Sequence, residues 1–463
     1  MRIKEEVVRE GEFWIADNIN EVVRGRLYIR ENQTILLELD GALNVASFFS
    51  GNTVLKRING KVEKEGEVTL EGCLYKKINI TGGIGEKSLI HVNCAFLGHA
   101  FKQDEEIKLD SLSFSVDHLE EWVGVTGISF DHKPNEKDVY AINYSRPKDI
   151  VISLDDGYEL KVTFGYAFKG TSSLKETKVE HMTNLVIEGD KPIPYEELSK
   201  IAHDVVKFIS LAFEKPLVIA RVRGRKKVQT EGVSQSTDFI SIYYKSNRYN
   251  ADRNDLEVND MIFEYKDIAN NASDHFKKWM KACKELSPSI SLYFSSAAGQ
   301  HGVIEARFIS LVQGLETYHR ANSHDKKMPQ ETFEDLVIQL INNCPDDHKE
   351  WLRGRLSHGN EINLMARMKS VTSCLEGILG DKKMLKSLSR EVVNTRNYLT
   401  HYNPDLKEKA ASGKRLVQLN YLLELVFLAH FLKIIGFDDE KIKMFYERNF
   451  RLKQLIRFIK TKN

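Results

Sequence analysis

The sequence has few cysteines, and none of them has a close partner. Five cysteines occur in 463 residues, and no two form a C-x-x-C motif. Such isolated cysteines argue against a zinc ribbon and against a disulfide framework, and they favour reduced, buried thiols. A glycine-rich phosphate loop is also missing, and no serine, histidine and aspartate arrangement can be established. We therefore expect no metal and no cofactor.

Net charge and long apolar runs are absent as well. The 67 Lys and Arg residues offset 66 Asp and Glu residues, which leaves a net charge of +1. Any basic surface for nucleic acid must therefore be local. The longest apolar stretch, residues 422–432, contains Glu424 and His430 and is too short and too mixed to span a membrane. Because the first residues also lack an apolar signal core, we expect a cytoplasmic protein without a membrane partner.

Length and pattern predict an α+β protein whose β-rich N-terminal domain precedes a helical bundle. A chain of 463 residues exceeds one compact domain. Residues 1–185 contain short apolar or alternating runs bounded by Gly and Asn, which are typical of strands in a sandwich or barrel. Asp155-Asp156-Gly157 between two such runs indicates a hairpin turn. Residues 117–122 favour a short helix, and its adjacent acids are typical of a solvated surface rather than of a metal site.

The pattern changes after residue 185. Residues 186–295 form a mixed connecting region, in which residues 195–213 show helical spacing after two prolines. A dense basic run follows at residues 221–227. It includes Arg223 and Arg225, which could hold RNA phosphates, although a solvated strand or loop is the usual explanation for such a run.

Residues 296–463 are predicted to be helical. Apolar stripes mark helices at residues 305–320, 361–379, 385–402 and 416–435. A last helix is expected over residues 440–460, and it is basic. Its residues Arg451, Lys453 and Arg457 are candidate contacts to an RNA backbone.

The strongest chemical signal is an Arg-Asn-x3-His motif formed by Arg396, Asn397 and His401. On a helix, Asn397 and His401 share a face, and Arg396 lies about 100° round the axis from Asn397. Arginine presents a planar fork to phosphate oxygens and can stabilise a phosphoryl transition state. Histidine titrates near neutrality and can move a proton to or from a ribose oxygen. The motif thus suits metal-independent RNA cleavage. The alternative without a function is a solvated helix face with a capping histidine.

One such triplet does not easily supply both an acid and a base. A two-fold dimer would place two arginines and two histidines around one phosphate. A looser Arg-x4-His pattern ends at His358, but it lacks the asparagine and runs into Gly359. We expect it at a helix end, as an accessory residue at most.

The motif resembles the hallmark of HEPN domains, a helical family. Outside the motif, segments of the chain resemble ApeA-type proteins, in which a β-rich domain precedes a HEPN domain. These segments are residues 11–14, 114–124, 306–320 and 356–361. The resemblance implies an antiphage protein that acts by abortive infection, and HEPN relatives commonly cleave RNA as dimers. It also implies a polar residue near the site on the first HEPN-like helix.

Four accessory residues follow from these expectations. Glu316 could position Arg396 or His401, and it could equally pair with Arg320 one helical turn away. His319 is similarly ambiguous, and His358 belongs to the looser pattern. Tyr402 could stack on a base, although an aromatic residue packed at a helix end is the commoner case.

The leading hypothesis is a metal-independent endoribonuclease that leaves 2′,3′-cyclic phosphate and 5′-hydroxyl ends. It would act as a homodimer on transfer RNA or another RNA, and an unknown phage-derived trigger would act at the N-terminal domain. The alternative is a non-catalytic HEPN module for dimerisation or for binding RNA or a nucleotide.

Overall fold

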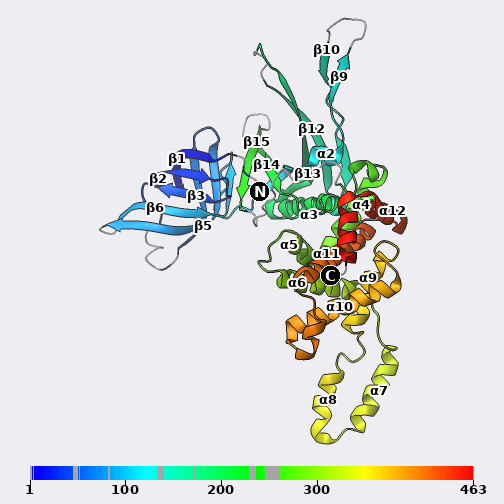
Figure 1. Ribbon diagram of the computed structural model, residues 1–463. Coiled ribbons are helices and arrows are strands. Elements are labelled where there is room, and N and C mark those ends of the chain that lie inside the picture. Colours follow the sequence, from blue (N-terminus) through cyan, green and yellow to red (C-terminus); the bar gives the residue numbers. More distant parts are fainter. Residues whose placement is uncertain are drawn as a thin grey trace. The chain divides into compact units, whose positions relative to one another are not determined.

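The chain folds into two compact units, which are described separately (Figure 1). The β unit comprises Met1–Ala212, Pro216–Val258 and Phe263–Met280, and the helical unit comprises Phe213–Lys215, Asn259–Ile262 and Lys281–Asn463. The computed structural model describes residues 3, 5–44, 51, 53–81, 84–132, 140–169, 174–228, 236–245 and 261–461.

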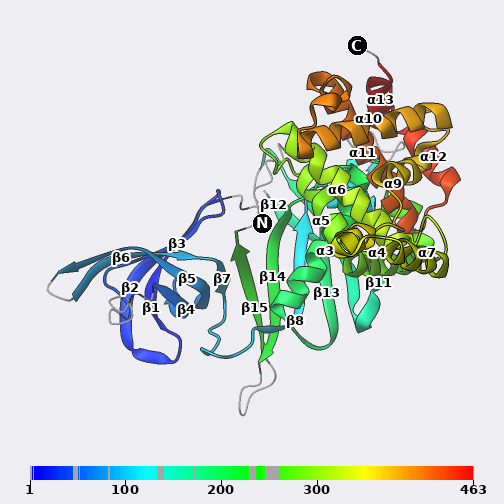
Figure 2. The ribbon, with the colours of Figure 1, turned by 90° about the horizontal axis from the view of Figure 1, so that it is seen from below.

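Six antiparallel strands of the β unit close into a barrel. Strand β6 pairs with β3 on one side and with β5 on the other, which joins the two ends of the strand order β5-β4-β1-β2-β3-β6. Alternate side chains fill the interior, among them Phe13, Leu37 and Leu70, each with 0 % exposure. The strands are β1 (Val7–Ile15), β2 (Asn18–Ile29), β3 (Ile35–Leu39), β4 (Val54–Val62), β5 (Gly66–Thr81) and β6 (Ile84–Val92) (Figure 2).

An open antiparallel sheet continues from the barrel in the order β5-β7-β15-β14-β8-β13-β12-β11. Its further strands are β7 (Cys94–Leu97), β8 (Lys108–Val116), β11 (Ile150–Ser153), β12 (Glu159–Lys169), β13 (Lys178–Pro194), β14 (Ile219–Val228) and β15 (Ser236–Tyr244). A separate hairpin pairs β9 (Ile128–His132) with β10 (Tyr140–Tyr144).

Helices α2 (Leu119–Val123), α3 (Tyr195–Phe213) and α4 (Ala272–Glu285) meet in an aromatic core of the β unit. Phe208 of α3 stacks on Phe276 of α4, with ring centroids 4.1 Å apart. Trp122 of α2 and Trp279 of α4 contact the same phenylalanine ring edge-on. Such rings bury large apolar areas, so this cluster fixes α2 beside the sheet.

The helical unit is built around α11 (Gly413–Ile434), which packs against α5, α6, α12 and α13. This helix is long and apolar enough to cross a membrane by composition, yet 72 % of the relevant window is buried inside the protein. It is therefore the core helix of the unit. The other helices are α5 (Ser287–Ala297), α6 (Ile304–Asn322), α7 (Gln330–Asn342), α8 (Lys349–Leu356), α9 (Leu364–Thr372), α10 (Lys382–His401), α12 (Asp439–Arg448) and α13 (Phe450–Lys460).

The predicted α+β class is confirmed, including the hairpin turn at Asp155–Gly157 between β11 and β12. Two helix predictions differ from the structure. The single basic helix predicted over residues 440–460 is broken at Asn449, whose extended backbone ends α12 and whose side chain caps α13. The helix predicted over residues 361–379 is shorter, because Asn363 caps α9 and a 3-10 turn follows at Ser373–Leu375.

Candidate functional site on helix α10

Helix α10 carries the Arg-Asn-x3-His motif in its last two turns. Asp381 caps the N-terminus, where its side chain accepts a hydrogen bond of 2.8 Å from the backbone N–H of Met384. The helix ends at His401, because Tyr402 adopts the left-handed conformation with φ of 50°. The buried stripe of the helix consists of Leu385, Leu388, Ser389, Val392 and Thr395. Since the motif lies outside this stripe, its side chains are available at the surface.

The guanidinium of Arg396 joins the three motif residues. Its Nη1 donates to Oδ1 of Asn397 at 3.2 Å and lies 3.4 Å from Nε2 of His401. A guanidinium can only donate hydrogen bonds, so Nε2 of His401 is the acceptor in this contact. Arg396 and Asn397 are half-buried, whereas His401 is exposed. The motif therefore combines a cation, an amide and an imidazole lone pair at one accessible place.

Two contacts hold this part of α10 in place. The carboxylate of Glu391 accepts two hydrogen bonds from Arg415 of α11, both of 2.7 Å. This bidentate pair is the main reason that the pKa of Arg415 is raised. The buried hydroxyl of Thr395 donates to the carbonyl of Glu391 at 2.8 Å and accepts from the N–H of Ala411 at 2.9 Å. The backbone just before the motif is thus fixed to the chain that follows the helix.

An aromatic pair lies at the C-terminal end of α10. The rings of Tyr398 and Tyr402 stack with centroids 5.5 Å apart and an interplanar angle of 27°. Tyr402 is 76 % exposed. A left-handed conformation is costly for any residue with a Cβ, and glycine is the usual choice at this cap. The residue after His401 is therefore an exposed tyrosine, although its left-handed backbone conformation favours glycine.

Two family models match the chain. Apea-like HEPN matches residues 309–441, and ApeA N-terminal domain 1 matches residues 8–279, which is more than half of the sequence. The chain belongs to the ApeA family. The motif of α10 lies within the matched HEPN residues, so this ApeA protein is an antiphage effector of the HEPN type, as its resemblance predicts. No curated protein and no solved structure matches the chain.

Two of the predicted accessory residues of this ApeA protein belong to a second cluster, centred on Glu361. The Glu361 carboxylate accepts hydrogen bonds from Arg320 at 2.5 Å and from Arg367 at 3.1 Å. It also lies 3.1 Å from Nδ1 of His358. Arg320 in turn donates to Glu316 at 3.2 Å, one turn back on α6. The hydrogen bond to Arg320 is the largest cause of the lowered pKa of Glu361.

His319 is the third accessory candidate at this cluster. Its side chain is buried, and its Nδ1 lies 3.3 Å from Nη1 of Arg367. Burial is the main cause of its lowered pKa, and the charge of Arg367 adds to the effect. A neutral, buried imidazole is therefore expected. Among the described residues, the side-chain hydrogen bonds of Arg396 go to Asn397 and His401 rather than to this cluster.

The basic candidates of the last helix differ in their surroundings. Nε of Arg451 lies 3.6 Å from the carboxylate of Glu214, which is 7 % exposed. Burial raises the pKa of this carboxyl to about 7, and Arg451 opposes the rise. Lys453 and Arg457 are exposed on the same helix. Of the three, these two are the accessible cations.

The basic run of the β unit forms strand β14. Arg223 is exposed, whereas Arg225 is half-buried and lies 3.8 Å from the carboxylate of Glu188. Lys226 is paired with Glu105 and lies over the ring of Phe101. Much of this charge is therefore balanced within the sheet.

Sequence reasoning missed Tyr398, the Glu361 cluster and the Glu391–Arg415 pair. The four-residue spacing of two tyrosines could have indicated the aromatic pair. The other contacts join segments far apart in the sequence, so no local pattern indicates them. Within the part of the chain that the structure describes, no three His, Cys, Asp or Glu side chains are grouped closely enough to hold a metal ion.

Proposed function

We propose that this protein is a metal-independent endoribonuclease whose active site is formed by Arg396, Asn397 and His401. The observation that carries the proposal is the contact of the Arg396 guanidinium with Nε2 of His401 at the accessible end of α10. A guanidinium binds phosphate oxygens, and an imidazole lone pair accepts a proton. RNA supplies its own nucleophile, the ribose 2′-hydroxyl.

The reaction follows from these groups. Nε2 of His401 takes the proton of the 2′-hydroxyl, and the 2′-oxygen attacks the neighbouring phosphorus. Arg396 stabilises the additional negative charge of the pentacovalent state, and Asn397 holds the guanidinium. The bond to the 5′-oxygen breaks, and that oxygen receives a proton from an acid. The products are a 2′,3′-cyclic phosphate and a 5′-hydroxyl. DNA lacks the nucleophile and is not cleaved.

The acid is proposed to come from a second copy of the chain. Each copy supplies one histidine of the motif, while the reaction needs a proton acceptor and a proton donor. A two-fold homodimer that brings two α10 helices together provides both, with two arginines around the phosphate. HEPN domains commonly dimerise and bind RNA, which supports this arrangement.

The tyrosine pair is proposed to hold a base next to the scissile phosphate. Exposed aromatic rings stack on unpaired bases, and each stack contributes about 1–3 kcal/mol to binding. Tyr402 is exposed and follows His401 directly in the chain. Lys453 and Arg457 are proposed to contact the phosphates of the RNA backbone, whereas Arg451 forms an ion pair with Glu214. Glu316, His319 and His358 would act indirectly, through the Glu361 cluster.

In the cell, the nuclease is proposed to be silent until a phage product acts on the N-terminal domain. A constitutive ribonuclease would harm its host, and this cost, together with the analogy to other antiphage effectors, supports regulation of this kind. The protein would act in the cytoplasm, where its RNA substrates are found. Equal activity and equal toxicity of the full chain and the isolated helical unit would contradict this regulation.

The proposal is tested with purified wild type, His401→Ala and Arg396→Ala, each checked for folding by circular dichroism. Total bacterial RNA is incubated with each protein in EDTA, with and without phage-infected lysate, and the cut ends are analysed for cyclic phosphate. Loss of the general base should lower the rate by about 10²–10⁴. His348→Ala, at an exposed histidine of the same unit, serves as the matched control and should cleave normally.

The outcomes separate the hypotheses. Cleavage that survives both substitutions places the active site elsewhere and overturns the proposal. Saturable binding of RNA or of a nucleotide, without cleavage under either condition, would instead identify a non-catalytic binding module.

A further inference from the structure

Strands β8 and β13 of the β unit pair along part of their length and then separate. The pairing of β13 with β8 ends at Leu185 of β13, which pairs with Phe114 of β8. Residues 178–184 of β13 pair with β12 on one side. On the other side β8 ends at Val116, and the chain turns into α2. The two strands and α2 thus enclose a fork-shaped space, which we call the β8–β13 fork.

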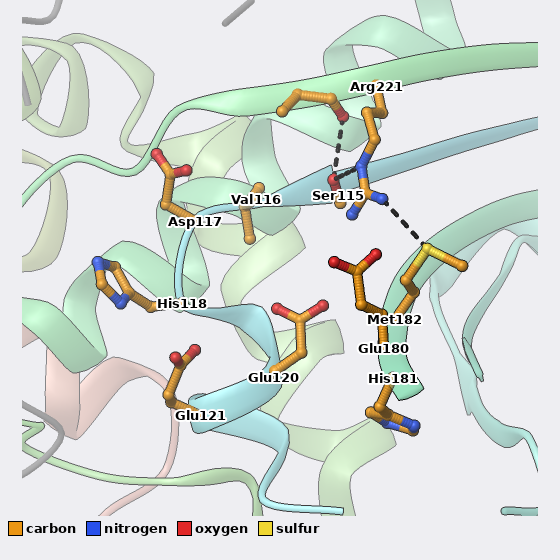
Figure 3. A pocket seen from close by; sticks show the side chains of 11 residues that line it. Ser115, Val116, Asp117, His118, Glu120, Glu121, Glu180, His181, Met182 and Arg221 are labelled. Atoms are coloured by element: carbon orange, nitrogen blue, oxygen red, sulfur yellow. Dashed lines mark hydrogen bonds between the residues drawn. The ribbon is translucent and has the colours of Figure 1, made fainter. Parts of the chain in front are cut away.

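The fork contains a cavity of about 480 Å³, a size typical of ligand sites. Three segments contribute its walls: the end of β8 with α2, the start of β13, and the start of β14 (Figure 3). The lining residues are Ser115, Val116, Asp117, His118, Glu120, Glu121, Glu180, His181, Met182, Ala220 and Arg221.

The edge of β13 that faces the fork offers backbone hydrogen bonds. The N–H of Thr183 points into it and donates to the Glu120 carboxylate at 2.9 Å. Along a strand, every second residue directs its N–H and C=O to the same edge. Val179 and His181 therefore present their backbone groups on the side of Thr183. A side-chain carboxylate occupies the place where a neighbouring strand would supply a carbonyl.

The charge of the fork is negative. Glu120 and Glu121 of α2 line it together with Asp117, and Glu180 of β13 also contributes a carboxylate (Figure 3). Glu180 is neutralised by Lys169 and Lys178, each 2.7 Å away.

Among the residues that line the cavity, Arg221 is a positive group. Its Nε donates to the hydroxyl of Ser115 at 3.1 Å, and its Nη1 lies 3.7 Å from the sulfur of Met182. This residue lies at the β14 side, away from α2 (Figure 3). The α2 side of the fork is therefore complementary to a cationic side chain.

We propose that the β8–β13 fork binds an extended basic peptide segment, which adds as a strand to the edge of β13 at residues 178–183. Backbone pairing with Val179 and His181 supplies the attachment, and a Lys or Arg side chain reaches the carboxylates of Glu120 and Glu121. This combination of strand addition and side-chain selection is an established mode of peptide recognition. The proposal is independent of the nuclease assignment, because binding is measured without RNA.

The test uses the full-length protein and a fluorescein-labelled octapeptide of alternating Lys and Thr, with anisotropy as the readout. The peptide should bind, and an octapeptide of alternating Glu and Thr should not. The double variant Glu120→Gln/Glu121→Gln keeps side-chain shape and removes two charges, so binding should weaken on the order of tenfold. Glu31→Gln, at an exposed turn of the barrel, is the matched control and should bind as wild type.

Two N-methylated peptides test the strand pairing itself. One is methylated on every Lys nitrogen and the other on every Thr nitrogen. Only one set of N–H groups faces β13 in an added strand, so one peptide should lose binding and the other should keep it. Hydrogen exchange of residues 178–184 should slow when the unmodified peptide binds. Absence of binding, equal binding to the double variant, or equal binding of both methylated peptides would each overturn the proposal.

Discussion

Replacing Glu214 with glutamine should stabilise the helical unit above neutral pH. The side chain of Glu214 is 7 % exposed and lies 3.6 Å from Nε of Arg451. Its burial raises the pKa of the carboxyl from 4.5 to about 7; the charge of Arg451 opposes this rise, and Glu424 adds to it. The buried surroundings therefore destabilise the ionised carboxylate of Glu214, although the cation Arg451 lies next to it.

The sign of the pH effect follows from proton linkage. Between about 4.5 and about 7 the folded protein holds this proton and the unfolded chain releases it. The contribution of Glu214 to stability is therefore greatest below the unfolded pKa, and it is lost as the pH rises through about 7. The whole difference corresponds to about 3 kcal/mol at most. Glutamine keeps the shape of the side chain and cannot ionise, and Arg451, with 33 % of its side chain exposed, can be hydrated.

The assay is urea unfolding of the full-length protein at pH 5 and pH 8, followed by the far-ultraviolet circular dichroism of the helices. For wild type, the midpoint of helix loss should shift to lower urea at pH 8. For Glu214→Gln this shift should be much smaller, with a remainder from Glu424, whose pKa is also raised by burial. Glu447→Gln, at an exposed glutamate of α12, should follow wild type. Identical pH dependence of wild type and Glu214→Gln would refute the reasoning.

Two further substitutions test the ends of helices. Tyr402→Gly should relieve the left-handed backbone and raise stability by about 1 kcal/mol, while RNA binding weakens because the stacking ring is lost. Melting temperature and RNA affinity report the two effects, and unchanged affinity would exclude the stacking role. Asn449→Ala removes the side chain that accepts from the N–H of Leu452 at 2.9 Å and should cost about 1 kcal/mol. Unchanged urea stability would contradict the role of Asn449 as a cap.

The elements that sequence predicts well are those whose signals are local. Helix α3 begins directly after two prolines and follows one apolar stripe over Tyr195–Phe213, as predicted. The turn at Asp155–Gly157 is set by Asp156 and Gly157, which both adopt positive φ. The motif helix α10 has a capping aspartate at one end and Asn403-Pro404 just beyond the other. In each case the residues that decide the structure lie within a few positions of it.

Contacts between segments that are far apart in the sequence could not be predicted in this way. Closure of the barrel depends on β6 meeting both β3 and β5, and no residue of β6 alone indicates two partners. The last helix has an unbroken basic and apolar pattern, yet Asn449 interrupts it by capping α13 with its own side chain. The site shows the same division. The motif residues Arg396, Asn397 and His401 can be recognised in the sequence. The contact of Arg415 with Glu391, which holds the motif helix, comes from the next helix and cannot.

The dimeric active site can be tested by mixing two inactive variants. Arg396→Ala homodimers would have two histidines and no arginine at the phosphate, and His401→Ala homodimers would have two arginines and no histidine. A mixed dimer has one Arg396 and one His401, contributed by opposite chains. If the two α10 helices share one phosphate, mixing after partial unfolding and refolding should restore a small part of the cleavage. The single histidine then acts as the base, and water has to protonate the leaving 5′-oxygen in place of the second histidine. If each copy acts alone, every site in the mixture lacks one of the two groups, and activity stays at the level of the separate variants. The contact between Nη1 of Arg396 and Nε2 of His401 lies within one chain, so restored activity would show that these two residues also act together when opposite chains supply them.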